Sequence, residues 1–205
     1  MSTASRELAP LPAVPLRFGM FLAAMESSYG PPDLGSGPGR GSRIESLQKR
    51  DPWAWKELFL SEMPAIYRYV ASRVPAGPEA EDLTSEVFEA AWANAGRLRD
   101  HGAPPRAWLF GIARNVVNDH RRRWFRRPPA FALTDNIPGA AAPGGDDHVL
   151  ADAISRLPAG QAEVINLRFV QGLSLQEAAD ALGSTIDAVK GRQARALLAL
   201  RQALS

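Results

Sequence analysis

The side chains that could carry a function in this sequence are charged groups gathered in two blocks. Residues 79–89 contain five carboxylates and no basic residue, and residues 104–128 contain seven arginines against a single acid, Asp119. A block of carboxylates attracts a basic protein surface, whereas arginine pairs with phosphates or base edges through its bidentate guanidinium group. The two blocks therefore predict a protein partner at the first and nucleic acid at the second, although each block alone is also what a solvated helix face contains.

The basic block falls on a helix expected from Pro105 to Arg123, and a helical wheel divides its side chains into two arcs. The apolar arc holds Leu109, Ile112, Ala113, Val116, Val117 and Trp124, which predicts that Trp124 packs in the core. The polar arc holds Arg114, Asn115, Asn118, Asp119, Arg121 and Arg122. Because asparagine can both donate to and accept from an exposed base, we interpret the polar arc as a reading surface for nucleic acid.

Composition excludes several other kinds of function. The chain has 205 residues, a formal charge of only +2 and no cysteine, so it has no disulfide scaffold, thiolate zinc site or cysteine nucleophile. The histidines, His101, His120 and His148, show no metal-ligand spacing. We expect no catalytic residue, no metal and no cofactor. The apolar run Phe18–Met25 is too short to span a bilayer, so no membrane association is expected and a cytoplasmic location is the default.

Helices must position these groups, because no useful alternating strand pattern is present. The sequence predicts an all-α protein of two small helical domains joined by a flexible linker. Gly and Pro content sets the boundaries: a mostly disordered extension over residues 1–45, a first domain over 46–127, the linker over 128–147 and a second domain over 148–205. Asp51 followed by Pro52 marks the N-terminus of the first long helix.

The second domain contains a segment with helix-turn-helix spacing. Ser174 and Glu177 can form a capping box, Ala178 is small where two helices would cross, and Gly183 can take the left-handed conformation at the turn. Ser184 or Thr185 then caps the second helix. An ordinary helical hairpin is the alternative for this pattern taken alone.

Four segments together resemble the extracytoplasmic-function sigma factors of bacterial RNA polymerase. They are residues 80–92 (Ala-Glu-Asp-Leu-Thr-Ser-Glu-Val-Phe-Glu-Ala-Ala-Trp), 107–115 (Ala-Trp-Leu-Phe-Gly-Ile-Ala-Arg-Asn), 157–168 (Leu-Pro-Ala-Gly-Gln-Ala-Glu-Val-Ile-Asn-Leu-Arg) and 189–192 (Val-Lys-Gly-Arg). The match covers roughly residues 50–205 in the family's order and spacing. A helix-turn-helix by itself is also found in LuxR-type regulators, so the pairing of both halves carries the resemblance.

The resemblance implies a protein that directs core RNA polymerase to promoters and initiates transcription. Its first domain would bind the polymerase clamp helices and the −10 element, and its second domain would bind the −35 element and the flap tip. Carried over by position, the polymerase-binding residues are Asp82, Ser85, Glu86 and Glu89. The −10 residues are Leu98, Arg114, Asn115, Asn118, Asp119, Arg121 and Arg122, with the loop 98–105 holding unpaired bases. The −35 residues are Thr185, Lys190, Arg192 and Arg195.

The resemblance also makes an anti-sigma factor a candidate partner. Ser85 departs from the family pattern, where glutamine is common, and so does Gly191 inside the recognition helix, where serine is frequent. These departures bear on promoter specificity rather than on architecture. Two other hypotheses remain at this point: a LuxR-like regulator with a sensing N-terminal half, and an enzyme. The LuxR-like hypothesis leaves the segments at 80–92 and 107–115 unexplained.

Overall fold

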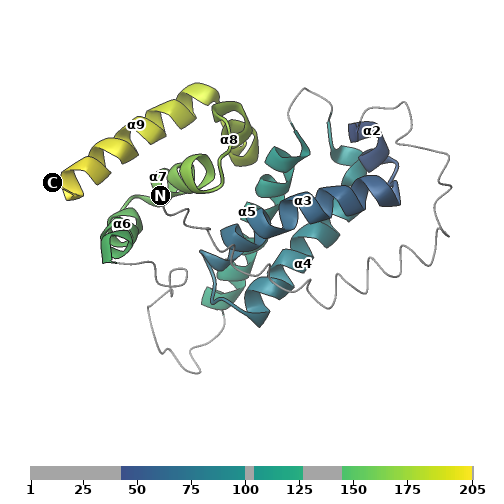
Figure 1. Ribbon diagram of the computed structural model, residues 1–205, viewed down its shortest axis with the longest axis horizontal. Helices are drawn as coiled ribbons and strands as arrows, with labels where there is room; N and C mark the ends of the chain where they lie inside the picture. Colours follow the sequence, from purple (N-terminus) through teal and green to yellow (C-terminus); the bar gives the residue numbers. More distant parts are fainter. Residues whose placement is uncertain (1–42, 100–103, 127–144, 205) are drawn as a thin grey trace, which may run out of the picture.

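The computed structural model describes residues 43–99, 104–126 and 145–204, and every element in them is helical. This confirms the predicted all-α class. The elements form two bundles (Figure 1). The first bundle contains α2 (Arg43–Gln48), α3 (Pro52–Ala71), α4 (Pro78–Ala93), the short 3-10 turn η1 (Ala95–Arg97) and α5 (Pro105–Arg126). The second contains α6 (Gly145–Ser155), α7 (Ala159–Ile165), the π-helical turn η2 (Asn166–Val170), α8 (Leu175–Leu182) and α9 (Ile186–Ala203).

Helix α3 begins where the sequence predicted and organises the first bundle. The Asp51 side chain accepts a hydrogen bond from the Ala54 amide at 2.8 Å, and Pro52 occupies the first turn. The apolar stripe of α3 packs against α4 through edge-to-face aromatic contacts, including Phe59 with Phe88 at 4.8 Å between ring centroids. Helix α4 is thereby fixed with its acidic side turned outward.

The second bundle contains the predicted helix-turn-helix, formed by α8 and α9. Ser174 and Glu177 make both hydrogen bonds of the capping box, and Gly183 ends α8 in the left-handed conformation at φ 57°. The Thr185 side chain caps α9 by accepting from the Ala188 amide at 3.2 Å. Each local signal in this segment therefore has the structural role that the sequence indicated.

Both bundles start slightly earlier than the Gly and Pro content predicted. Helix α2 begins at Arg43 because it buries Ile44 and Leu47 against the first bundle, and the Leu47 carbonyl accepts from Trp55 Nε1 at 2.8 Å. Helix α6 begins at Gly145, inside the range assigned to the linker. The remainder of the predicted extension and linker lies outside the described residues.

The two bundles pack on each other and share one hydrophobic core. This core runs from Leu58 and Phe110 in the first bundle to Leu167, Leu173 and Ala178 in the second. The contact is made chiefly by α8 lying on α5, as the adjacent ribbons in Figure 1 show. Among the described helices, none has the length and apolar character needed to cross a bilayer.

Candidate nucleic-acid and protein interfaces

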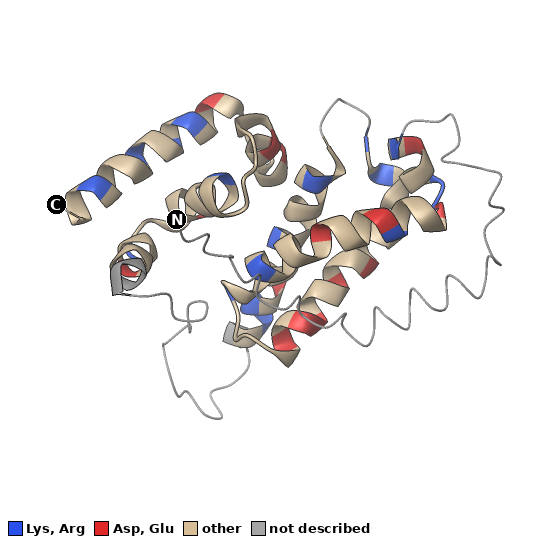
Figure 2. Ribbon diagram, in the orientation of Figure 1, with Lys and Arg blue, Asp and Glu red and all other residues tan. Residues whose placement is uncertain are grey.

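Helix α4 presents carboxylates to solvent on the side opposite its buried face. Leu83, Val87 and Phe88 are buried, whereas Asp82 and Glu89 are exposed. Glu86 is half-buried, and its Oε1 lies 3.5 Å from Nη2 of Arg123 on α5. We call Asp82, Glu86 and Glu89 the acidic surface. Figure 2 shows the acidic residues of α4 as red segments along its ribbon.

Ser85 does not belong to this surface, in contrast to the position-by-position expectation. It is 1% exposed, and its hydroxyl donates to the Glu81 carbonyl at 3.1 Å within the helix. A serine hydroxyl in a helix readily bonds to the preceding turn, which here holds the short side chain against the core side. Ser85 is therefore packed inside the bundle, beneath the acidic surface.

Helix α5 carries a stripe of one tryptophan, one glycine and two asparagines at helical spacing. Trp108, Gly111, Asn115 and Asn118 lie on one face because positions separated by three, four and seven residues share a side of a helix. Asn115 is exposed and Asn118 is half-buried. We call these four residues the α5 stripe, and it contains two of the predicted −10 residues.

The charged −10 candidates lie along the rest of α5. Arg121 and Arg122 are exposed, and Arg114 is half-buried. Arg122 Nη2 donates a hydrogen bond to Asp119 Oδ1 at 2.6 Å. Trp124, which the wheel predicted in the core, is 60% exposed. That prediction was wrong, because a wheel gives the direction of a side chain but not whether a neighbouring element reaches the last turn of the helix.

Leu98 is also buried instead of lying on the interface. It is 3% exposed, and its carbonyl accepts a hydrogen bond from Gln48 Nε2 at 2.6 Å. Leu98 thus anchors the start of the loop to α2. Residues 100–103 of that loop lie outside the described part of the chain.

A pocket of about 210 Å³ opens beside this anchor. Its walls come from both bundles and consist of Arg97, Leu98, Arg99, Pro104, Ala107, Trp108 and Asp180. An aromatic ring next to guanidinium groups is suited to a stacked base with its phosphate. Sequence reasoning did not single out Arg97 and Arg99, although their positions on both sides of Leu98 in the predicted loop were a usable signal.

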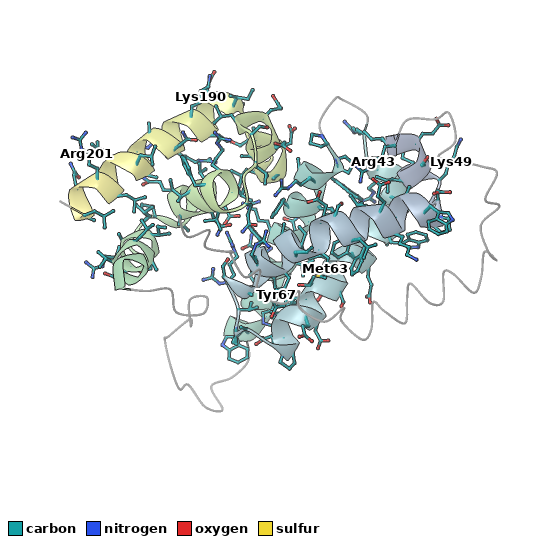
Figure 3. All side chains as sticks on the ribbon, in the orientation of Figure 1. Arg43, Lys49, Met63, Tyr67, Lys190 and Arg201 are labelled. Atoms are coloured by element: carbon teal, nitrogen blue, oxygen red, sulfur yellow. The ribbon has the colours of Figure 1, made fainter. Side chains whose placement is uncertain are left out.

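Helix α9 displays the predicted −35 residues on a surface away from the first bundle. Lys190 and Arg195 are exposed and Arg192 is half-buried. Figure 3 shows Lys190 and Arg201 extending from the outer side of α9. Thr185 stands at the N-terminus of the helix, the end that enters the major groove in helix-turn-helix proteins.

Gly191 offers a test of how α9 is used. A Cβ at Gly191 would meet only the Arg195 side chain, at 3.6 Å from Nη1, so the fold accepts alanine there. We expect Gly191→Ala to raise the free energy of unfolding by roughly 1 kcal/mol through helix propensity. If DNA approaches this position closely, the same variant binds −35 duplex at least about fivefold more weakly, because the added methyl group blocks the approach.

Chemical denaturation and duplex titration measure these two effects on the same protein. Ala194→Gly, at an exposed position of α9, is the reverse control for propensity. A Gly191→Ala protein that is more stable and binds DNA unchanged would show that the glycine has no role in DNA contact.

Two polar clusters at the contact between the bundles escaped sequence reasoning altogether. Tyr69 Oη donates to Glu163 Oε1 at 2.5 Å, and Arg73 Nη2 bonds Glu163 Oε2 at 2.7 Å. Burial raises the pKa of the Tyr69 hydroxyl above its ordinary range, so the hydroxyl remains a donor at neutral pH. Tyr69 and Arg73 are separated from Glu163 by 94 and 90 positions in the chain, and no local pattern connects them.

The second cluster is centred on Arg106 of α5. Its Nε lies 3.3 Å from Glu62 Oε2, and its Nη2 donates to the Gln171 carbonyl of the second bundle. Burial raises the pKa of Glu62, although Arg106 beside it acts in the opposite direction. In the part of the chain that the structure describes, no three metal-ligating side chains come together.

Two family models match the chain, in the order of the two bundles. The model described as Sigma-70 region 2 matches residues 58–126, and that described as Sigma-70, region 4 matches residues 153–202. The first match spans the acidic surface and the α5 stripe. The second spans the helix-turn-helix.

Individual relatives carry corresponding names. The chain is 37% identical to the ECF RNA polymerase sigma factor SigD of Mycobacterium tuberculosis, over 79% of this chain and 84% of that protein. It is 34% identical to the ECF RNA polymerase sigma factor BldN of Streptomyces coelicolor over 78% of this chain. The aligned part spans only 64% of the length of BldN.

Two solved structures with similar folds are those of proteins in complexes. CnrH bound to the cytosolic domain of CnrY matches with a TM-score of 0.58 and 26% identity, covering 79% of this chain and 94% of that one. The sigma factor RpoE with the anti-sigma factor NepR from Bartonella quintana matches with a TM-score of 0.59 and 29% identity, covering 73% and 96%.

Proposed function

The chain belongs to the extracytoplasmic-function (ECF) sigma factors of RNA polymerase, and we propose that its three mapped surfaces divide the work of promoter recognition. As a member of this family it directs core RNA polymerase to promoters. In our proposal the acidic surface binds the clamp helices, the α5 stripe and its pocket hold the −10 strand, and α9 reads the −35 duplex. The second bundle would also bind the flap tip.

The observation that carries this division is the separation of charge within one small bundle. The acidic surface lies on α4, whereas the exposed arginines Arg121 and Arg122 lie on α5. A basic protein surface and a polyanion can therefore be bound at the same time without competing for the same side chains. The buried residues Ser85 and Leu98 support these surfaces from beneath.

We assign the predicted domains to these roles. Residues 46–127 form the polymerase and −10 domain and residues 148–205 the −35 domain, with 128–147 as the connection between them. Both matched models describe parts of a transcription initiation factor, and we propose that the chain has no catalytic activity and no cofactor. The region 2 match over 58–126 also accounts for the segments that a LuxR-like regulator would leave unexplained.

We further propose that the protein works in the cytoplasm and that an anti-sigma factor regulates it. Two solved relatives, CnrH and RpoE, are bound to the cytosolic domain of CnrY and to the anti-sigma factor NepR. Such a partner would have to cover the acidic surface or keep the two bundles from reaching DNA.

Reconstitution with core RNA polymerase tests the proposal. The purified chain is mixed with core enzyme and a pool of random DNA, and templates that yield run-off transcripts are selected and sequenced. We expect enriched templates to share two elements separated by a fixed spacer, and we expect no transcript from core alone. Failure to bind core, or transcripts without shared elements, would overturn the assignment.

A further inference from the structure

Helix α3 carries apolar side chains on its outer side as well as on its buried side. Only four of its 20 residues are charged. Trp55, Phe59 and Ile66 belong to the buried side, which faces the core of the first bundle. A surface helix normally has polar side chains opposite its buried side, and a helix that is apolar all round is normally covered all round. The outer side of α3 therefore has the composition of a surface that another element covers.

The apolar side chains of the outer side form one stripe. Positions 53, 60, 64, 67 and 71 are separated by seven, four, three and four residues, so they fall within a narrow arc of a helical wheel. They are Trp53, Leu60, Pro64, Tyr67 and Ala71, which we call the α3 stripe. Trp53 and Leu60 are 54% and 57% exposed, and the other three are half-buried. The arc of the α3 stripe is opposite that of the buried side, so the core of the bundle does not cover it.

The sequence contains an amphipathic segment that matches this stripe. Residues 16–29, which we call the N-terminal segment, lie outside the described part of the chain. Their large apolar side chains recur at the i, i+3, i+4 and i+7 positions of a helix and are Phe18, Phe21, Leu22 and Met25. Pro15 and Pro31 flank the segment, as is typical of the two ends of a helix. A helix this short is marginal alone in water, so its apolar side needs a surface to pack on.

The described chain begins beside the α3 stripe. Arg43 is the first residue of α2, and its Nη2 lies 3.5 Å from Oε1 of Glu57. Glu57 lies between Trp53 and Leu60 along α3. Figure 1 shows α2 next to the N-terminal half of α3. The N-terminal segment is therefore tethered to a point next to the stripe.

The length of this tether suits the distance that it has to span. Ten of the 13 residues from 30 to 42 are Gly, Ser or Pro. A Gly- and Ser-rich chain of this length has a root-mean-square span of about 20 Å. The α3 stripe is about 27 Å long at a rise of about 1.5 Å per residue, and the tether begins beside it. A tether whose mean span matches the distance to its site gives the highest effective concentration there.

We infer that the N-terminal segment of this chain docks as a helix on the α3 stripe. Its Phe21 and Leu22 cover Trp53 and Leu60 and complete the first bundle on the side opposite its core. The inference is independent of the proposed function, because it uses none of the residues that we assign to polymerase or DNA. A second copy of the chain on the stripe, and docking of the segment on the second bundle, are the competing arrangements that the tests separate.

A photocrosslinker beside the stripe tests this inference on the full chain. The natural sequence has no cysteine, so Ser61→Cys provides a single thiol for a benzophenone label at an exposed position that flanks the stripe. Ser155→Cys on α6 is the matched control, because Ser155 is also exposed. Each serine hydroxyl donates to the carbonyl three residues earlier, at 3.0 Å for Ser61 and 2.7 Å for Ser155. After irradiation, mass spectrometry identifies the captured peptides.

We expect the label at position 61 to capture residues 16–29 at least about tenfold more often than the label at position 155, independently of protein concentration. Phe21→Gln/Leu22→Gln in the same labelled chain should reduce this capture at least about fivefold, because burial of these two side chains stabilises the docked segment. Equal capture from the two positions, or stronger capture from position 155, would overturn the inference. Crosslinked dimers whose yield rises with concentration would assign the stripe to a second copy of the chain instead.

Thermal unfolding of the full chain gives a second measurement. Leu60→Gln replaces an apolar side chain that is 57% exposed on α3, and Leu198→Gln does the same on α9 at 58%. Leucine and glutamine have similar helix propensities, so the exchange should change the unfolding midpoint little at an uncovered position. We expect Leu60→Gln to lower the midpoint by at least about 3 °C and Leu198→Gln to lower it by less than about 1 °C.

Coupling between the two surfaces shows whether the N-terminal segment causes this difference. In the Phe21→Gln/Leu22→Gln chain, Leu60→Gln should lower the midpoint by less than about 1 °C further, since side chains in contact lose their shared stabilisation only once. An equal shift from Leu60→Gln with and without the apolar side chains of the segment would show that Leu60 stabilises α3 without it. That result would overturn the inference and would leave the proposed function intact.

Discussion

Reversing the charge of Asp82 and Glu89 together should weaken binding of core RNA polymerase by about 100-fold, or about 2.7 kcal/mol. Both carboxylates are exposed on α4, and within the described residues neither is recorded in an ion pair that would need to break first. Each lysine would replace an attraction to the basic clamp helices with a repulsion at the same distance. Titration of labelled core enzyme with Asp82→Lys/Glu89→Lys measures the loss.

Glu57→Lys is the matched control for this variant. Glu57 is likewise an exposed acid, on α3, and its ion pair with Arg43 at 3.5 Å is solvent-exposed and contributes little to stability. We expect the control to bind core within about threefold of the wild type, as expected for a rim charge away from the contact. Both proteins should keep the helical circular dichroism and the unfolding midpoint of the wild type. Equal affinities of the two variants would remove α4 from the polymerase interface.

Salt provides a second signature of the same interface. Attraction between an acidic helix and a basic surface weakens as the Debye length shortens, so the wild type should lose affinity for core as salt rises. The reversed variant should lose much less, because its attractive charges are already gone. A parallel salt dependence of both proteins would show that binding is carried by other groups.

Signals confined to a few neighbouring residues predicted the fold correctly. The Asp51 cap, the Ser174 capping box and the turn at Gly183 each depend on atoms within four residues of one another, so sequence spacing defines their geometry. The helical period then assigned most buried positions, because a stripe of apolar side chains needs a core wherever it lies. The two bundles followed from these elements.

Positions that depend on a distant neighbour were not predicted. Trp124 lies on the apolar arc but is exposed, and Ser85 and Leu98 carry interface roles in the family pattern but are buried here. The hydrogen bond from Tyr69 to Glu163 spans 94 positions, and only the folded chain brings the two side chains together. A position-by-position transfer from a family therefore locates a surface, whereas burial decides which of its residues can touch a partner.

Asn115→Ala should slow formation of the open promoter complex roughly tenfold while leaving the first, closed complex within about twofold of the wild type. Asn115 is exposed on the α5 stripe, two turns from Trp108 at the pocket, and its amide can both donate to and accept from a base edge. Such contacts are worth about 1–3 kcal/mol of discrimination, and they form only once a base has left the duplex. The step that melts the DNA therefore carries the whole effect.

Arg121→Ala is the informative comparison, because Arg121 is exposed on the same helix but suited to a phosphate contact. Its loss should weaken closed and open complexes alike and should reduce the dependence of binding on salt. Stopped-flow fluorescence with a reporter base in the −10 element separates the two steps for both variants. If Asn115→Ala instead lowered only the affinity for intact duplex, the stripe would read paired DNA, and the pocket beside Leu98 would have to serve another ligand. The contrast between the two variants thus distinguishes base capture from backbone contact on a single helix.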